Sequence, residues 1–175
     1  MSTKKVQNST NTLYLSLGSN IGERLLFLQE AIALIDSKVG KINKKASIYK
    51  TPAWGFDGQD FLNTCIEIET QYATKECLKL FQEIETYLGR KAKTSKNYEN
   101  RVIDIDIIYS SEGIFNYSFI TVPHPLLHQR KFVLLPLNDI IPHYKHPLLH
   151  KNTEQLIEIC DDQSTISVFK EKKAF

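Results

Sequence analysis

The sequence predicts a single α+β domain with a ferredoxin-like sandwich, in which the element order βαββαβ builds a mainly antiparallel sheet with helices packed on it. Two observations support this class. Alternating or β-branched apolar stretches indicate four strands, at residues 12–17, 45–50, 61–70 and 102–109. Apolar residues at helical spacing indicate one helix between the first two strands and another between the last two. A chain of 175 residues is long enough to bury a sizeable core, and no linker divides it.

The first strand and the first helix have clear patterns. Residues 12–17 alternate leucine with tyrosine and serine, as expected for a strand with one buried face. Gly18, Ser19 and Asn20 are turn formers that end this strand. The helix that follows extends to about Ser37, and Gly40 marks its exit. Its apolar stripe consists of Leu25, Leu28, Ile32 and Ile35.

A loop at residues 51–60 (TPAWGFDGQD) separates the second strand from the third. It carries the only Trp of the chain, and aromatic residues on a loop are candidates for binding. The third strand, residues 61–70, should direct Leu62, Thr64, Ile66 and Ile68 to the core. The second helix begins at Thr74, a suitable N-cap, and stops at Gly89. Its buried stripe is Cys77, Phe81, Ile84 and Leu88.

The fourth strand, residues 102–109 (VIDIDIIY), carries two acidic residues. Successive side chains of a strand point to opposite faces, so Asp104 and Asp106 share one face, and three isoleucines share the other. Apolar residues on both faces predict a central strand that is covered on both sides. Two buried carboxylates are costly unless a cation neutralises them, and Mg²⁺ is bound by one or two carboxylates together with substrate phosphates. The alternatives are a half-exposed strand with its Asp residues in water, or Asp paired with Lys or Arg.

The remaining segments are less regular. Residues 113–122 predict a hairpin or an edge strand, Pro-punctuated short helices reach Tyr144, and residues 153–160 predict a last helix. We expect residues 1–11 to be a disordered tail, residues 12–169 to form the domain, and residues 170–175 to be a loose C-terminus.

The composition argues against several classes of protein. The chain is 42% hydrophobic and 24% charged, as in ordinary globular proteins, and its net charge of +2 gives no reason to expect a nucleic-acid or membrane partner. No stretch approaches the length of a transmembrane helix. The three cysteines, Cys65, Cys77 and Cys160, form no CxxC pair, which argues against a disulfide framework or a zinc ribbon. We therefore expect a cytoplasmic protein.

One short motif recurs. His-Pro-Leu-Leu-His occurs at residues 124–128 and again at residues 146–150. Two His residues at positions i and i+4 of a helix could bind zinc. A proline inside each copy opposes the helix that such a site requires, so zinc binding is the less favoured interpretation.

Several polar residues gather around the acidic strand in the predicted fold. Carboxylates with Arg and His nearby are the groups that phosphoryl transfer needs, because that chemistry depends on positioning and charge neutralisation. No Walker A sequence is present, which excludes a P-loop. The alternative is a set of surface charges at a domain edge. The residues concerned are Gln82, Glu85, Arg90, Arg101, His124, Arg130 and the aromatic Phe132.

Six segments of the chain, in order, resemble the 6-hydroxymethyl-7,8-dihydropterin pyrophosphokinase family. They are LYLSLGSNIG at 13–22, YKTPAWG at 49–55, DFLN at 60–63, ETYLGR at 85–90, RVIDIDII at 101–108 and TVPHPLLHQRKFVLLPL at 121–137. The resemblance implies a ferredoxin-like fold. It also implies transfer of pyrophosphate from ATP to 6-hydroxymethyl-7,8-dihydropterin, with release of AMP, in tetrahydrofolate biosynthesis.

The resemblance also implies roles for individual residues. Asp104 and Asp106 would bind two Mg²⁺ ions that bridge the ATP phosphates, and Arg90 and Arg101 would join them in catalysis. The pterin site would consist of Thr51, Pro52, Trp54, Phe61, Asn63 and Phe132, with Asn63 at the polar edge of the ring and the two Phe rings on its faces. The ATP contacts would be Gln82, Glu85, Arg101, Ile107, Thr121, His124 and Arg130. We expect a monomer whose partners are these two small substrates.

Two of the departures of the chain from the family pattern lie at residues 98–101 and at residue 119. Residues 98–101 are Tyr-Glu-Asn-Arg where the family has Trp-Gly-Pro-Arg, and Phe119 stands where the family has an Arg. We expect the segment 90–101 to close over the nucleotide in spite of this change.

Two other classes compete with this interpretation. A nucleotide-sugar transferase would share the metal chemistry, but 175 residues are few for a doubly wound donor domain. An RNA-binding ferredoxin-like module needs exposed aromatic residues on its central strands, which Ile-Asp-Ile-Asp-Ile does not supply.

Overall fold

The computed structural model describes residues 10–91 and 99–170. Within them, one antiparallel sheet has the strand order β5-β1-β4-β3-β8, and β2 pairs with β4 beside β3. Its strands are β1 (Asn11–Ser19), β2 (Lys41–Lys45), β3 (Tyr49–Thr51), β4 (Phe61–Thr70), β5 (Asp104–Ser110) and β8 (Ser167–Val168). A separate hairpin consists of β6 (Phe115–Tyr117) and β7 (Ile120–Val122). The helices are α1 (Arg24–Lys38), α2 (Thr74–Tyr87), α3 (Lys131–Ile140) and α4 (Thr153–Glu158), with a 3-10 turn η1 (Leu127–Gln129).

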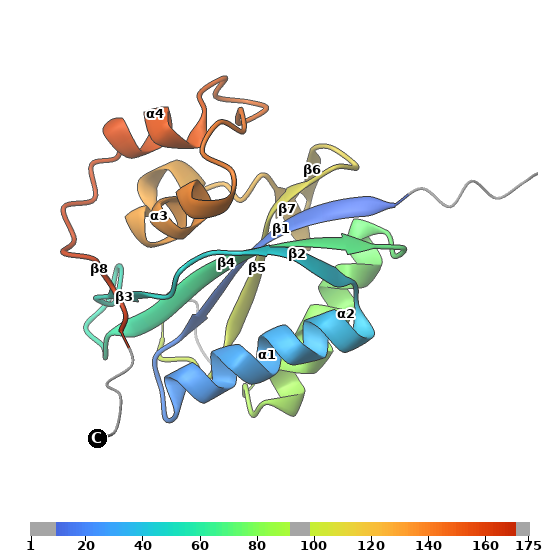
Figure 1. Cartoon of the computed structure of the whole chain (residues 1–175), viewed down its shortest axis with the longest axis horizontal. Helices are drawn as coiled ribbons and strands as arrows, with labels where there is room; N and C mark the ends of the chain where they lie inside the picture. The colour runs from blue at the N-terminus through green and yellow to red at the C-terminus, as the bar shows by residue number, and fades with distance from the viewer. Residues whose placement is uncertain (1–9, 92–98, 171–175) are drawn as a thin grey trace, which may run out of the picture.

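Helices cover both faces of the sheet (Figure 1): α1 and α2 lie on one side, and α3 and α4 on the other. A larger core, which includes Leu15, Phe81 and Ile105, fills the space beneath α1 and α2. A second core, which includes Cys65 and Leu134, lies beneath α3 and α4. β4 is buried at nearly every position because both of its faces are covered.

The predicted order βαββαβ is confirmed, with β1, α1, β2–β3, β4, α2 and β5 in sequence. The hairpin at 113–122 and the helix after residue 153 are also confirmed. The single strand predicted at 45–50 is wrong, because β2 and β3 are two short strands. Lys45 pairs with Ile66 and Tyr49 with Asn63, so four steps along one strand match only three along β4. One residue must bulge out, which breaks the strand.

The prediction that the acidic strand is central is wrong. β5 pairs only with β1 among the described strands and therefore forms an edge of the sheet. Its apolar residues face both sides for another reason. Leu15 pairs with Ile107 and Tyr14 with Tyr109, so Ile108 is an extra residue in β5. This bulge turns both Ile108 and Tyr109 toward the second core, whereas Ile107 stays in the first.

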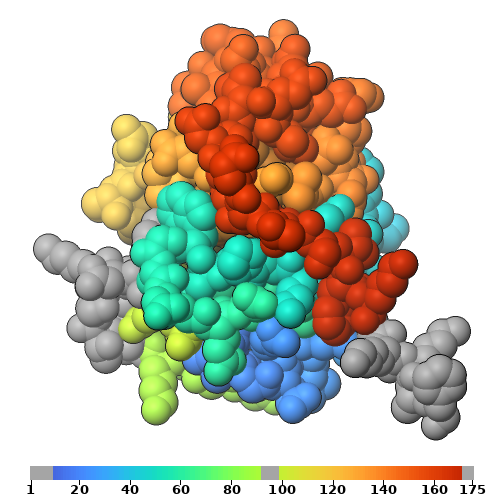
Figure 2. Space-filling view, turned by 90° about the vertical axis from the view of Figure 1, so that its left-hand side faces the viewer, coloured from blue at the N-terminus to red at the C-terminus, as the bar shows by residue number. Residues whose placement is uncertain are grey.

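The predicted tails, residues 1–11 and 170–175, overlap the described residues only at residues 10–11 and 170. Asn11, predicted as the last residue of the tail, is the buried first residue of β1, and its side chain donates to Thr74 Oγ1 at 3.0 Å. At the other end, the segment that leads to β8 crosses the surface (red in Figure 2), and Val168 pairs with Tyr49 of β3. No helix among the described residues is long and apolar enough to cross a membrane.

We expect the larger core to dominate the stability of the fold. Phe81 on α2 is only 1% exposed, so Phe81→Ala should lower the free energy of unfolding by about 3 to 5 kcal/mol, the usual cost of a large cavity. Tyr87 lies on the same helix and is 76% exposed, so Tyr87→Ala is the matched control and should change it by less than about 1 kcal/mol. Urea titration followed by circular dichroism measures both. Equal losses in the two variants would contradict this packing.

Candidate active site

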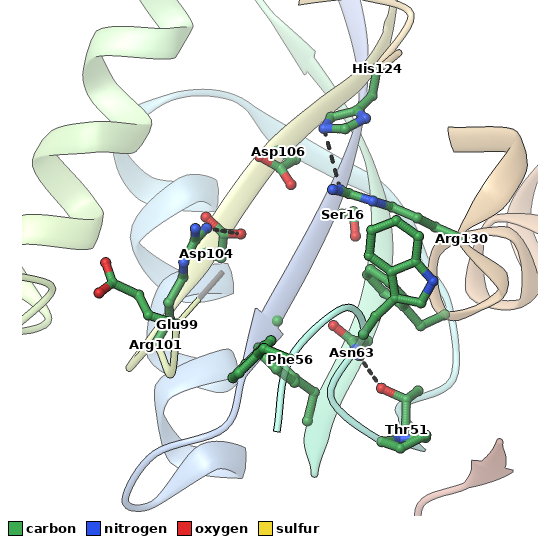
Figure 3. A pocket seen from close by; sticks show the side chains of 15 residues that line it. Ser16, Thr51, Phe56, Asn63, Glu99, Arg101, Asp104, Asp106, His124 and Arg130 are labelled. Carbon is green, nitrogen blue, oxygen red and sulfur yellow. Dashed lines mark hydrogen bonds and ion pairs between the residues drawn. The ribbon is translucent and has the colours of Figure 1, made fainter. Parts of the chain in front are cut away.

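A pocket of about 210 Å³ opens where β1, β4 and β5 meet the loop 51–60. Figure 3 shows that charged groups from β5 and aromatic groups from the loop face the same space. The pocket therefore has a charged half and an aromatic half. Its lining residues are Ser16, Gly18, Thr51, Pro52, Trp54, Phe56, Phe61, Asn63, Glu99, Arg101, Asp104, Asp106, His124, Arg130 and Phe132.

The charged half is built on β5. Asp104 lies opposite Gly18 in the β1–β5 ladder, and Asp106 lies opposite Ser16, so both carboxylates stand beside small residues. Arg101 Nη1 contacts Asp104 Oδ2 at 2.7 Å, and Arg90 Nη1 contacts Asp104 Oδ1 at 2.8 Å. Asp104 is thus neutralised by two arginines. Asp106 makes no hydrogen bond or ion pair with another described residue.

The end of α2 positions Arg90. Gly89 adopts φ +100°, which favours glycine, and closes the helix in a Schellman motif. In this motif the Arg90 amide donates to the Glu85 carbonyl at 2.9 Å, and the Gly89 amide donates to the Thr86 carbonyl at 3.0 Å. The chain therefore turns back on itself, so that the Arg90 guanidinium also reaches the Glu85 carboxylate at 2.5 Å. Glu85 in turn accepts a hydrogen bond from the Ile105 amide at 2.7 Å, which ties α2 to β5.

Two carboxylates in and beside the charged half have raised pKa values. Burial raises the pKa of Glu85 to about 7, with a further contribution from the charge of Asp104, while Arg90 and the Ile105 amide oppose the shift. Burial and the charge of Asp104 likewise raise the pKa of Asp106, and Arg130 opposes the shift. Burial and the charge of Asp104 together therefore disfavour the ionised forms of Glu85 and Asp106 in spite of the nearby arginines, so a bound cation would stabilise this half of the pocket.

The aromatic half is organised around one buried amide. Asn63 on β4 is 3% exposed, and its Nδ2 donates to Thr51 Oγ1 at 2.7 Å. Its Oδ1 occupies the space above Gly18, where a Cβ atom would overlap it. Gly18 is therefore required by the position of the Asn63 amide. The Thr51 hydroxyl on β3 and the absence of a side chain at Gly18 on β1 together fix the orientation of the Asn63 amide.

Four aromatic rings line the pocket together with this amide. Trp54 and Phe132 form one pair, with ring centroids 6.3 Å apart, and Phe56 and Phe61 form another, also 6.3 Å apart. The Arg130 guanidinium stacks over Trp54, 5.1 Å from the ring centroid, and over Phe132 at 5.7 Å. Arg130 thus joins the aromatic half to the charged half. Flat apolar walls with one polar edge suit a planar heteroaromatic ring.

His124 and Arg130 form a pair that suits an anion. The Leu126 amide donates to His124 Nδ1 at 3.2 Å, so the neutral ring carries its proton on Nε2. His124 Nε2 lies 3.3 Å from Arg130 Nη1, and both groups are then donors. An oxyanion placed between them would accept from both.

Comparison with known proteins agrees with this geometry. The family model of 7,8-dihydro-6-hydroxymethylpterin-pyrophosphokinase (HPPK) matches residues 14–142. The chain belongs to this family. It is 35% identical over 141 residues to the 2-amino-4-hydroxy-6-hydroxymethyldihydropteridine pyrophosphokinase of Aquifex aeolicus, which covers 80% of this chain and 86% of the relative. The Bacillus subtilis protein of the same name is 34% identical over 164 residues, 93% of this chain and 92% of the relative.

A solved structure shares the fold. The Plasmodium falciparum HPPK-DHPS crystal structure superposes with a TM-score of 0.74 at 17% identity. The alignment covers 87% of this chain and 46% of the Plasmodium chain, so the present chain spans less than half of that protein. At this identity the likeness establishes the ferredoxin-like α+β fold alone. Membership of the HPPK family makes the chain an ATP-dependent pterin pyrophosphokinase.

The structure brings most of the predicted HPPK site residues together. All six predicted pterin residues line the pocket, as do Arg101, Asp104, Asp106, His124 and Arg130. Arg90 and Glu85 stand behind Asp104. Four predicted ATP contacts do not line the pocket. One is Glu85, behind Asp104; of the others, Gln82 is exposed on α2, Thr121 is exposed on β7, and the Ile107 side chain is buried in the larger core. Part of the segment 90–101 that was expected to close over the nucleotide, residues 92–98, lies outside the described residues.

Sequence reasoning missed four lining residues: Ser16, Gly18, Phe56 and Glu99. The first two belong to no motif that singles them out, and their importance follows from their positions opposite Asp106 and Asp104. Phe56 belongs to the aromatic loop already singled out, so its composition was the available signal. Glu99 lies in the irregular segment before β5, where periodicity gives no information.

The repeated His-Pro-Leu-Leu-His motif has a structural explanation. The Leu148 amide donates to His146 Nδ1 at 3.2 Å, just as Leu126 does to His124. In each copy the first His therefore fixes a turn. Within residues 10–91 and 99–170 no three His, Cys, Asp or Glu side chains are grouped so that they could hold a metal ion.

His124 gives the site a pH signature. Burial and the charge of Arg130 lower its pKa from 6.5 to about 4, so the unfolded chain binds a proton that the folded chain refuses. Stability should therefore fall as the pH falls from about 6.5 toward 4, by about 2 kcal/mol between pH 7 and pH 5. His124→Gln should remove that part of the pH dependence, and His143→Gln, whose side chain is 78% exposed, should leave it unchanged. Urea titrations at the two pH values test this. The same loss of unfolding free energy between pH 7 and pH 5 in wild type and His124→Gln would contradict it.

Proposed function

We propose that the pocket binds 6-hydroxymethyl-7,8-dihydropterin in its aromatic half and the ATP phosphates in its charged half. The proposed reaction transfers the terminal pyrophosphoryl group of ATP to the hydroxymethyl oxygen and releases AMP. The observation that carries this assignment is the position of Gly18, which pairs with Asn63 of β4 on one side and with Asp104 of β5 on the other. Two strand spacings, about 10 Å, therefore separate the backbones of Asn63 and Asp104, which leaves room for a ring and its side arm between the two strands.

The pterin half of the proposal depends on shape and one polar edge. Phe61 and Phe132 line the pocket and offer apolar faces to a flat ring. Asn63, held by Thr51, presents its amide to the edge of that ring, where it can pair with ring donors and acceptors. A site built to pair with such groups discriminates strongly against a ring that lacks them, because its own buried groups would be left unpaired.

The nucleotide half requires cations as well as arginines. Asp104 and Asp106 are oxygen donors on one face of β5, and the pKa of Asp106 is raised by the burial of its uncompensated charge. These residues fit Mg²⁺, which is commonly held by one or two carboxylates plus phosphate oxygens. We propose that they hold two Mg²⁺ ions, which when bound supply charge neutralisation for the ATP phosphates. We propose that Arg101, Arg130 and His124, which line the pocket, donate to the remaining phosphate oxygens, and that Arg90 supports Asp104 from behind.

The chemical step then needs alignment more than covalent help from the protein. The pterin hydroxymethyl oxygen forms a bond to the β-phosphorus, the bond from that phosphorus to the oxygen of the α-phosphate breaks, and AMP leaves as the hydroxyl proton is lost. The aromatic walls orient the nucleophile, and Arg101 fixes Asp104. The pocket also replaces water around the reacting groups, which limits hydrolysis of ATP.

The assignment of the carboxylates is testable by substitution. Asp106→Asn should reduce ATP-dependent AMP release with hydroxymethyldihydropterin by about 100-fold or more, since it removes charge from the transition-state site. The fold should persist, because neutralising Asp106 relieves repulsion from Asp104. Asp36→Asn is the control, since Asp36 lies outside the pocket and accepts a hydrogen bond from the Ile42 amide.

Chromatographic AMP detection and a thermal melt with and without Mg²⁺ and a non-hydrolysable ATP analogue complete this test. The wild type should show a larger ligand-dependent shift of its melting temperature than Asp106→Asn. Near-wild-type turnover of Asp106→Asn at ordinary Mg²⁺ would refute the metal assignment. No AMP release by the wild type would refute the proposed reaction.

Gly18 gives an independent test of the pterin half. Gly18→Ala should weaken pterin binding about tenfold or more, because the new methyl group displaces the Asn63 amide and leaves polar groups unpaired. If the clash is with that amide, the double variant Gly18→Ala/Asn63→Ala should bind pterin no worse than Asn63→Ala alone. Calorimetric titration measures these affinities, and additive losses would show that Gly18 acts elsewhere.

A further inference from the structure

Asn20 is a buried residue that does not line the pocket, yet it contacts the segments on both sides of the pocket. It follows β1 and is 0% exposed. Its Nδ2 donates to the Gln59 carbonyl at 3.1 Å and to Asn100 Oδ1 at 2.6 Å. Its Oδ1 accepts from the Arg101 backbone amide at 2.6 Å. The backbone amide of Asn20 donates to the Arg101 carbonyl at 3.0 Å. Every polar atom of this side chain is therefore used in joining three segments.

The joined segments belong to different halves of the pocket. Gln59 lies near the end of the loop that carries Trp54 and Phe56 of the aromatic half. Arg101 holds Asp104 of the charged half at 2.7 Å. The loop and the segment before β5 also touch directly, since a Cβ atom at Gly58 would lie 2.8 Å from Asn100 Oδ1. A shift of either segment must therefore strain the hydrogen bonds of Asn20.

We propose that Asn20 is a positioning residue that couples the two halves of the pocket, so that binding of the nucleotide and binding of the pterin strengthen each other through it. This inference rests on the proposed function, because it takes each half to bind its own substrate. Ligand contacts that order Arg101 also order the Asn20 amide, and the amide holds Gln59 and with it the aromatic loop. The second ligand then meets a loop that is already ordered, which is the condition for positive coupling.

Substitutions can separate the two links. Asn20→Ala removes all the side-chain bonds. Asn20→Asp keeps an acceptor for the Arg101 amide and loses the donor to Gln59 and Asn100, so it should break the link to the loop while the bond to Arg101 remains. Asn100→Ala removes only one bond, from an exposed residue, and serves if Asn20→Ala does not fold.

Asn11 provides a matched control. It lies at the opposite end of β1, is 4% exposed, and donates through Nδ2 to the Tyr72 carbonyl at 3.3 Å and to Thr74 Oγ1 at 3.0 Å. It does not line the pocket. Asn11→Ala should therefore cost stability as Asn20→Ala does, without reaching either substrate.

The experiment measures the pterin dissociation constant by calorimetry, with and without Mg²⁺ and a non-hydrolysable ATP analogue, together with kcat and KM. In the wild type the nucleotide should tighten pterin binding by about tenfold, within the usual range of coupling factors. Asn20→Ala and Asn20→Asp should bring this factor close to one and lower kcat, Asn100→Ala should reduce it about threefold, and Asn11→Ala should leave it unchanged.

The outcomes distinguish this inference from the proposed function. A coupling factor of one in the wild type, a wild-type factor in Asn20→Ala, or an equal loss in Asn11→Ala would each overturn the role of Asn20 while AMP release by the wild type upholds the reaction. A wild type that neither binds hydroxymethyldihydropterin nor releases AMP would overturn the function itself.

Discussion

The charge of two carboxylates on one edge strand is the constraint on which the site depends. Asp104 and Asp106 line the pocket and are only partly exposed to solvent, and carboxylate charge in such a place is costly without partners. Arg90 and Arg101 contact Asp104. The Schellman turn at Gly89 positions Arg90, and hydrogen bonds to the distant Asn20 position Arg101. The end of α2 and the turn after β1 thus serve the same pair of charges.

The register of β1 explains why both substrate halves meet. Gly18 lies between Asn63 on β4 and Asp104 on β5, and Ser16 lies between Cys65 and Asp106. A larger side chain at Gly18 would displace the Asn63 amide. At Gly18, β1 therefore contributes space between the two polar side chains rather than a side chain of its own.

Sequence patterns predicted what depends on local periodicity and failed where partners decide. The order of the elements, both main helices and the acidic pair followed from periods of two and 3.6 residues. The break between β2 and β3 did not, because it arises from a mismatch with β4. The edge position of β5 and the extra residue Ile108 are likewise properties of pairing. Asn20 reads locally as a turn former, and its contacts with Gln59, Asn100 and Arg101 depend on segments far along the chain.

The two copies of His-Pro-Leu-Leu-His show the same limit within one motif. In both, Nδ1 of the first His accepts a backbone hydrogen bond, so the local structure is repeated. His146 then packs its ring against Tyr109, with centroids 5.7 Å apart, and is 4% exposed. His124 instead directs Nε2 toward Arg130 at the pocket. The same five residues thus give a core contact in one place and an anion site in the other, because Arg130 is adjacent to only one of them.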